Sequence, residues 1–125
     1  MILGTGIDVI DFAKLEHAVS EHGDRFLKKV FTDREIRYCR SKAKPVQHFA
    51  GRFAAKEAVM KALHTGWSEG VKWKDIEVFV QEAGGPTVEL SGGARAYAER
   101  MGLKTIHLSI SHSGDYAIAS AIVEG

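Results

Sequence analysis

Residues 46–63 read VQHFAGRFAAKEAVMKAL, and their pattern predicts the central element of the fold. At about 100° per residue, a helix over this stretch would carry its bulky and its small residues on opposite sides. The bulky side consists of Val46, Phe49, Phe53, Met60 and Leu63, and the small side consists of Gly51, Ala54, Ala55, Ala58 and Ala62. Helices that are apolar almost all round are usually buried, and small residues allow close backbone approach. The pattern therefore predicts a central helix covered on both sides.

Charged residues interrupt this apolar helix. Lys56 falls within the bulky side, and Glu57 and Lys61 lie beside it, four residues apart. A buried ionised group is costly unless it is paired or binds an ion. Two interpretations are equally open from the helix alone: Glu57 and Lys61 form an ordinary surface i,i+4 pair, or they belong to a functional site.

The elements outside this helix follow from periodicity and capping signals. Thr32 and Glu35 match the Thr-x-x-Glu capping box, and Asp11 and Ser91 are further candidate caps. The expected strands are 2–7 (ending at Asp8), 76–80, 87–90, 106–110 and 116–123, and the expected helices are 12–22, 25–30, 33–44, 46–63 and 92–101. This order predicts one α+β domain over residues 1–125, with helices packed on a mainly antiparallel sheet.

Composition narrows the classes of function. The chain has a net charge of +1, which argues against bulk nucleic-acid binding. No apolar run reaches the roughly 20 residues of a membrane helix, and the start lacks the features of a signal peptide. One cysteine, Cys39, rules out an internal disulfide and favours a cytoplasmic location. The six histidines show no H-x-x-x-H spacing, which makes a zinc site improbable.

Two acidic residues suggest a metal site that handles phosphate. Asp8 comes at the expected end of a strand, where turn residues and metal ligands both occur. Together with Glu57 it would provide oxygen ligands suited to Mg²⁺, with phosphates and waters completing the shell. Arg52, Lys56 and Lys61 would then neutralise a polyanionic substrate. Gly4-Thr5-Gly6 lacks the lysine and the spacing of a phosphate loop.

His112 is a further candidate for chemistry. It ends an expected strand, where it would serve as a phosphate donor or a general base, or have only a structural role. The serines around it lack the G-x-S-x-G elbow of a hydrolase, so a serine-hydrolase mechanism has weak support.

Three motifs together resemble the short branch of the phosphopantetheinyl transferases, the holo-acyl-carrier-protein synthase family. They are Gly4-Thr5-Gly6-Ile7-Asp8, then Gly51-Arg52-Phe53-Ala54-Ala55-Lys56-Glu57-Ala58 with Lys61, and Ser109-Ile110-Ser111-His112-Ser113. The resemblance covers almost the whole chain. It implies that the phosphopantetheine arm of coenzyme A is transferred to a serine of apo acyl carrier protein, for fatty acid biosynthesis, with adenosine 3′,5′-bisphosphate as the other product.

The resemblance also assigns roles to residues. It implies that Asp8 and Glu57 hold Mg²⁺, that Glu57 and Lys61 are catalytic, and that coenzyme A contacts Arg52, Lys61, Gly66, Pro86 and His112. The general base is left open between Glu57, Glu35 and a metal-bound water. Mg²⁺ and Mn²⁺ are not distinguished.

The family resemblance further implies partners. Short-branch members are similar to homotrimers with active sites between subunits. Acyl carrier proteins are acidic, and the basic residues Lys14, Arg25 and Lys28 on the first two helices would form the docking patch. The family often has arginine where this chain has Lys14, and lysine lacks the bidentate fork of arginine.

Two other functions use the same residues. A Mg²⁺-dependent phosphodiesterase or nucleotide hydrolase would use water in place of the serine hydroxyl. A non-catalytic subunit would bind coenzyme A or a nucleotide without turnover.

Overall fold

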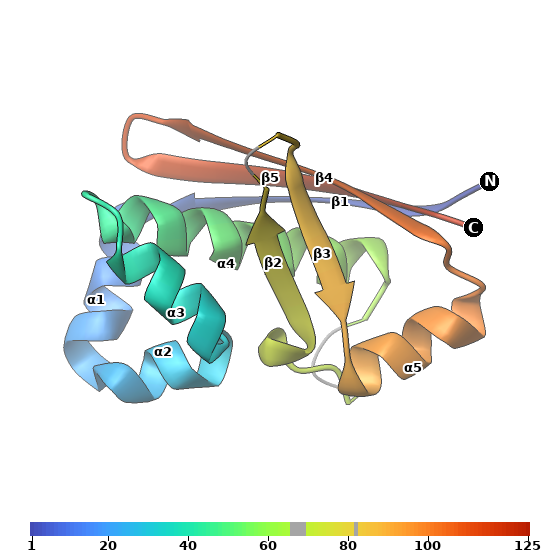
Figure 1. The fold of residues 1–125 in the computed structure, drawn as a ribbon, viewed down its shortest axis with the longest axis horizontal. Coiled ribbons are helices and arrows are strands. Elements are labelled where there is room, and N and C mark those ends of the chain that lie inside the picture. Colours follow the sequence, from blue (N-terminus) through green and yellow to red (C-terminus); the bar gives the residue numbers. More distant parts are fainter. Residues whose placement is uncertain (66–69, 82) are drawn as a thin grey trace.

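The computed structural model describes residues 1–65, 70–81 and 83–125. In this part of the chain, two antiparallel sheets and four α-helices surround a fifth, long central helix (Figure 1). The helices are α1 (Phe12–His22), α2 (Asp24–Val30), α3 (Asp33–Arg40), α4 (Pro45–Ala62) and α5 (Gly92–Met101), with a 3-10 turn, η2 (Trp73–Asp75). The strands are β1 (Ile2–Asp11), β2 (Ile76–Val80), β3 (Pro86–Leu90), β4 (Thr105–Ser113) and β5 (Tyr116–Glu124). The expected α+β class with antiparallel sheet is confirmed.

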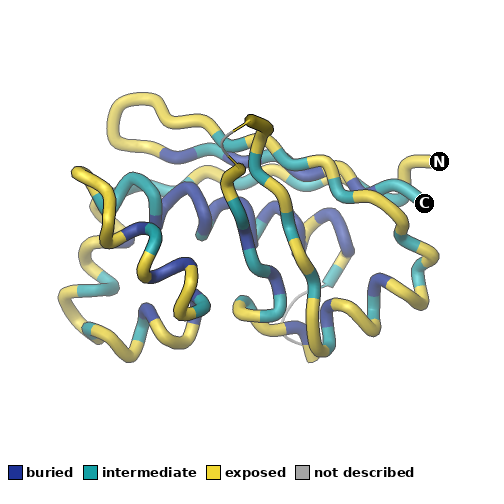
Figure 2. Tube along the Cα trace, viewed as in Figure 1, coloured by how far each residue is buried: buried dark blue, intermediate teal, exposed yellow. Residues whose placement is uncertain are grey.

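The central helix α4 lies between two layers. The three-stranded sheet, in the order β1-β5-β4, runs along one side of it, and the β2-β3 hairpin crosses its other side (Figure 1). Helices α1 to α3 gather at one end and α5 lies at the other. Of the 18 residues of α4, 11 are buried, so the helix is a core element as its composition predicted (Figure 2). In the described part of the chain, no helix is both long and apolar enough to cross a bilayer.

Two of the three expected helix caps form as the sequence signals predict, whereas Ser91 stands at the N-cap of α5 without a capping hydrogen bond from its side chain. The Asp11 side chain accepts a hydrogen bond from the backbone N–H of Ala13 and so opens α1. Thr32 and Glu35 form both halves of the expected capping box. Gly102 ends α5 in the left-handed conformation. One expected boundary also differs: α3 ends at Arg40, and Pro45 begins α4 instead of closing the preceding helix.

Strand β1 is longer than its sequence suggested. It continues past Asp8 to Asp11, because β5 pairs with it along its length and Asp8 lies opposite Ala119. Asp8 is therefore a residue within a strand and not at its end. The period of two in a strand puts Gly4, Gly6 and Asp8 on the same face.

That face of β1 lies directly against the small side of α4. A Cβ atom added to Gly6 would lie 1.9 Å from the carbonyl oxygen of Ala58, and one added to Gly4 would lie 2.1 Å from that of Ala62. Side chains on β1 would therefore push the strand off the helix. The two glycines allow this close packing, which sets where the next inward residue, Asp8, lies relative to α4.

We predict that Gly6→Ala destabilises the protein by at least about 1–3 kcal/mol, as overpacking of a core contact does. The added methyl group would clash with the backbone carbonyl of Ala58, and a backbone group cannot move aside as a flexible side chain can. Urea unfolding followed by circular dichroism measures the loss. Thr5→Ala, on the exposed opposite face of β1, is the matched control, and an equal loss there would contradict the explanation.

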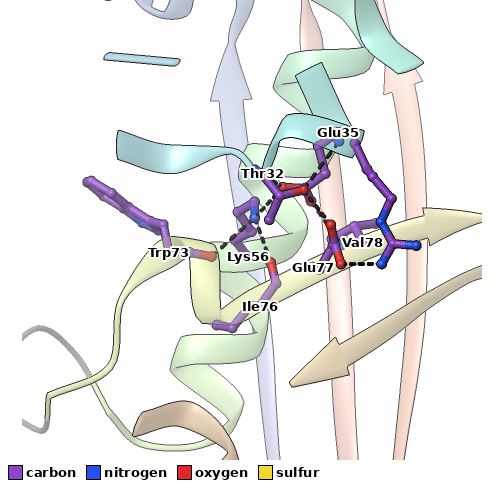
Figure 3. A network of polar contacts seen from close by, with 8 residues as sticks. Thr32, Glu35, Lys56, Trp73, Ile76, Glu77 and Val78 are labelled. Carbon is purple, nitrogen blue, oxygen red and sulfur yellow. Dashed lines mark hydrogen bonds and ion pairs between the residues drawn. The ribbon is translucent and has the colours of Figure 1, made fainter. Parts of the chain in front are cut away.

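A buried ion pair joins α3 to α4. Lys56 Nζ lies 2.8 Å from Glu35 Oε1, and both side chains are almost fully inaccessible. Lys56 also donates to the carbonyls of Trp73 and Ile76, while Glu35 accepts from the backbone N–H groups of Thr32 and Val78 (Figure 3). The hypothesis that Lys56 neutralises a phosphate is therefore wrong. Glu35, one of the three candidates left open for the general base, is held in this buried pair. Each side chain is bound to the other and to backbone groups.

We predict that Lys56→Met costs about 3–5 kcal/mol of stability, because removing one partner leaves the other charge buried without compensation. Chemical denaturation of the variant measures this cost. Combining it with Glu35→Gln should recover a large part of the loss, since the remaining amide is neutral. A double variant no more stable than Lys56→Met would show that packing of the lysine stem, and not charge, is responsible.

Candidate functional site

Asp8 on β1 and Glu57 on α4 lie near enough for their charges to interact. Burial of the Glu57 carboxyl raises its pKa, the hydrogen bond from Trp73 opposes this rise, and the negative charge of Asp8 adds to it. Two carboxylates in one half-buried place repel each other and favour a cation between them. This closeness is what the sequence-based metal site required.

One carboxylate oxygen of Asp8 has no hydrogen-bond partner. Oδ2 is buried and unpaired, whereas Oδ1 accepts from Lys61 Nζ at 3.0 Å. A buried unpaired oxygen is costly unless something binds it. Asp8 and Glu57 thus fit a small hard cation, which oxygen ligands prefer.

Lys61 pairs with Asp8 and not with Glu57. Its ammonium group lies 3.0 Å from Asp8 Oδ1 and donates to the carbonyl oxygen of Ile7 at 2.9 Å. The simple interpretation of Glu57 and Lys61 as an i,i+4 surface pair is therefore replaced by a contact between α4 and β1. The Lys61 side chain is half exposed, so its charge is accessible to a ligand beside the two acids.

The number of protein ligands is small. Within residues 1–65, 70–81 and 83–125, no three histidine, cysteine, aspartate or glutamate residues group as a metal cluster. Mg²⁺ commonly uses one or two carboxylates and keeps its other positions for phosphates and water. The pair fits this mode and does not fit a structural zinc site.

Arg52, Pro86 and His112 meet at a second place. They line one cavity of about 210 Å³, although they come from α4, β3 and β4. Its other lining residues are Tyr38, His48, Gly51, Val80 and Ile110. Three of the residues expected to contact coenzyme A thus line the same cavity. Asp8, Glu57 and Lys61 are not among its lining residues.

The Arg52 side chain has the properties of an anion-binding group. It is buried, its guanidinium lies 4.2 Å from the centroid of the Tyr38 ring, and its Nε has no hydrogen-bond partner. A buried guanidinium carries five N–H donors that require acceptors. The cavity beside it therefore suits phosphate or another anionic group.

His112 has a defined proton position. Its Nε2 lies 3.0 Å from the carbonyl oxygen of Gln47, which only accepts hydrogen bonds, so Nε2 carries a proton and donates. Gly51 makes room for this ring, because a Cβ there would lie 3.1 Å from Nε2. Packing against the His112 ring therefore explains why the residue before Arg52 is a glycine.

Two residues of this cavity were not identified from the sequence. His48 lies four residues before Arg52 and so on the same helix face, a spacing that could have identified it. Burial, and then the charge of Arg52, lower the pKa of His48. Tyr38 comes from α3, and no local sequence pattern predicts its contact with Arg52.

The remaining sequence-based candidates have different positions. Lys14 on α1 and Arg25 and Lys28 on α2 are exposed, as a docking surface requires. Arg25 lines a groove of about 410 Å³ together with Ala18, His22, Phe26, Lys29 and Trp73. Gly66 lies outside the described residues.

We predict that Glu57→Gln weakens Mn²⁺ binding at least tenfold without loss of stability at pH 7. Because the pKa of Glu57 is raised in the fold, its neutral form is favoured there, and the stability it gives is lost as pH rises through that pKa. Glutamine is neutral throughout and keeps an oxygen to accept from Trp73.

Titration of free Mn²⁺ by electron paramagnetic resonance and urea unfolding at pH 4 and 7 check both parts. Relative to the wild type, the variant should gain stability between pH 4 and pH 7. A variant that loses stability and Mn²⁺ binding together would make Glu57 a structural residue.

Comparisons with known proteins give a consistent set of similar proteins. Residues 4–121 match the model of the 4'-phosphopantetheinyl transferase superfamily. The chain is similar to the holo-[acyl-carrier-protein] synthase of Koribacter versatilis, with 49% identity over 99% of both chains. It is also similar to the crystal structure of the Neisseria meningitidis holo-[acyl-carrier-protein] synthase, with a TM-score of 0.92, 29% identity and full coverage of both chains. The Helicobacter pylori enzyme, solved in complex with coenzyme A, matches with a TM-score of 0.84 and 30% identity over 96% of this chain and 99% of that one.

Proposed function

Because this chain belongs to the 4'-phosphopantetheinyl transferase superfamily, we propose that it is a holo-[acyl-carrier-protein] synthase. It transfers the 4'-phosphopantetheine arm of coenzyme A to a serine of apo acyl carrier protein, the step that prepares the carrier for fatty acid biosynthesis. The observation that carries this proposal is the proximity of the Asp8 and Glu57 charges, with an unpaired buried oxygen on Asp8 and with Lys61 bound to its other oxygen.

The reaction breaks the phosphoanhydride bond of coenzyme A and forms a phosphoester bond to the carrier serine. The serine oxygen attacks the β-phosphorus of coenzyme A, the pyrophosphate bond breaks, and adenosine 3′,5′-bisphosphate leaves. A divalent cation held by Asp8 and Glu57, proposed to be Mg²⁺, would neutralise the pyrophosphate charge. Lys61, half exposed beside Asp8, would add a second positive charge on the phosphates.

Glu57 is our candidate for accepting the serine proton. One of its oxygens accepts from Trp73, and its other oxygen is the proposed proton acceptor. Burial raises the pKa of Glu57 above its usual range, which improves a carboxylate as a base. Glu35, the other carboxylate considered from the sequence, is held by Lys56.

The cavity of Arg52, Pro86 and His112 is the proposed site for the nucleotide end of coenzyme A. Arg52 brings N–H donors and positive charge, the His112 ring is held in place by its Nε2–H donated to Gln47, and Pro86 and Ile110 provide apolar surface for a base. Gly66, expected to border the same ligand, remains part of this proposal on the resemblance alone.

We propose that the enzyme is a homotrimer with active sites between subunits. The sheet face of β1 and β5 turned away from α4 exposes Ile7, Val9 and Ile122, although large apolar side chains favour burial. In addition, Asp8 and Glu57 are not among the residues that line the cavity of Arg52, Pro86 and His112. A neighbouring subunit on the sheet face would cover the apolar residues and let the two parts face one ligand.

Incubation of the protein with coenzyme A, Mg²⁺ and apo carrier protein tests the function. We predict that the carrier gains the mass of phosphopantetheine, as followed by mass spectrometry of the intact protein. A carrier with alanine at its acceptor serine is the control and should gain none. Hydrolysis of coenzyme A with an unmodified carrier would instead indicate the phosphodiesterase alternative.

The groove beside Arg25 is the proposed docking site of the acidic carrier, together with Lys14 and Lys28. Arg25 and Lys29 place positive charge at a groove whose walls include Phe26 and Trp73. Trp73 in turn donates to Glu57, which supports the proposal that a carrier bound in this groove would bring its serine toward the proposed catalytic carboxylate.

We predict that Arg25→Glu raises the KM for the carrier about tenfold at low salt and leaves the KM for coenzyme A unchanged, because rim charges mainly steer association. Steady-state kinetics with each substrate varied separately measures both values. Lys104→Glu, an exposed lysine that follows α5 at the opposite end of the molecule, is the matched control (Figure 1). An equal rise for both variants would reduce the effect to net charge.

A further inference from the structure

Trp73 connects the proposed catalytic carboxylate to the buried ion pair. It lies in the turn η2, just before β2, and its indole Nε1 donates to Glu57 Oε1 at 3.2 Å. The indole ring packs against Phe53, with 5.6 Å between ring centroids. The side chain is half buried and so has limited freedom to move away from Glu57.

The backbone of Trp73 is fixed to the same helix. Its carbonyl oxygen accepts from Lys56 Nζ at 3.1 Å, and Lys56 immediately precedes Glu57 on α4 (Figure 3). Lys56 itself is held by Glu35. The chain from Lys56 through the carbonyl and the indole of Trp73 to Glu57 is therefore a closed loop of two hydrogen bonds and covalent bonds.

The turn that carries Trp73 is held on its other side as well. The Asp75 carboxylate accepts from the backbone N–H groups of Lys72 and Ala94. The backbone N–H of Ser91 donates to the carbonyl of Asp75. The indole thus projects from a turn fixed to α4 at one end and to the start of α5 at the other.

We infer that Trp73 is a positioning residue, whose indole N–H holds one oxygen of Glu57 so that the carboxylate faces the cation beside Asp8. This inference depends on the proposed metal site. An indole N–H is only a donor, so Trp73 cannot itself bind a cation through nitrogen. Partners that orient metal-binding carboxylates typically contribute 10–100-fold to metal affinity or activity.

Trp73→Phe tests the inference, because phenylalanine keeps an aromatic ring against Phe53 and removes only the donor and part of the ring. Mn²⁺ is the probe, with free Mn²⁺ measured by electron paramagnetic resonance. We expect Mn²⁺ affinity to fall about 10–100-fold. Coenzyme A binding in EDTA, measured by calorimetry, should stay within about twofold, since Arg52 and His112 do not depend on the indole. Transfer activity should recover as Mn²⁺ is raised.

Phe53→Leu is the matched control. It thins the packing under the indole but leaves the N–H, so it should lower the unfolding temperature while Mn²⁺ affinity stays within about twofold. Unchanged Mn²⁺ affinity in Trp73→Phe would overturn the inference. Equal losses of Mn²⁺ affinity in the two variants would also overturn it, because packing and not the donor would then be responsible.

The inference and the proposed function fail in different ways. A wild-type protein that does not modify the carrier contradicts the proposed function. A wild-type protein that modifies the carrier and binds Mn²⁺ no better than Trp73→Phe contradicts only the role of Trp73.

Discussion

The ion pair of Lys56 and Glu35 is the interaction on which the arrangement of elements depends. It lies where α3, α4, η2 and β2 meet, and each charged group also satisfies backbone groups of neighbouring elements. A buried pair of charges contributes little stability compared with apolar residues of the same size. What it does impose is geometry, because neither charge tolerates the loss of its partner. The α3 helix and the β2-β3 hairpin are therefore fixed against α4.

Burial also distinguishes Lys56 from Lys61, the lysine of the proposed site on the same helix. Desolvation lowers the pKa of Lys56, which Glu35 opposes. Lys61, five residues further along α4, is half exposed, and its charge is compensated by Asp8 at the surface of the helix. One lysine of the same helix thus holds the fold, and another is accessible to a phosphate. Their different roles follow from which element packs over each of them.

The second constraint is the close packing of β1 on α4. Gly4 and Gly6 lie against backbone carbonyls of the helix, and the strand alternation then brings Asp8 beside Glu57. The order Gly-x-Gly-x-Asp is therefore one structural device: two residues without side chains allow the approach, and the third carries the carboxylate. It acts through packing and does not form the phosphate loop that its glycines superficially suggest.

Local sequence patterns were sufficient to predict most of the helices and strands. Caps at Asp11 and Thr32, the Gly102 stop and the two-sided apolar pattern of α4 act within a few residues, so local physics was sufficient to predict them. The motifs identified the family and selected Asp8 and Glu57, which the structure brings together. Only the tertiary structure decided the partners of the charges: Lys56 with Glu35, Lys61 with Asp8, and Arg52 with Tyr38. Helical spacing tells which residues share a face, but the partner of a face comes from a distant segment, and no local spacing specifies it.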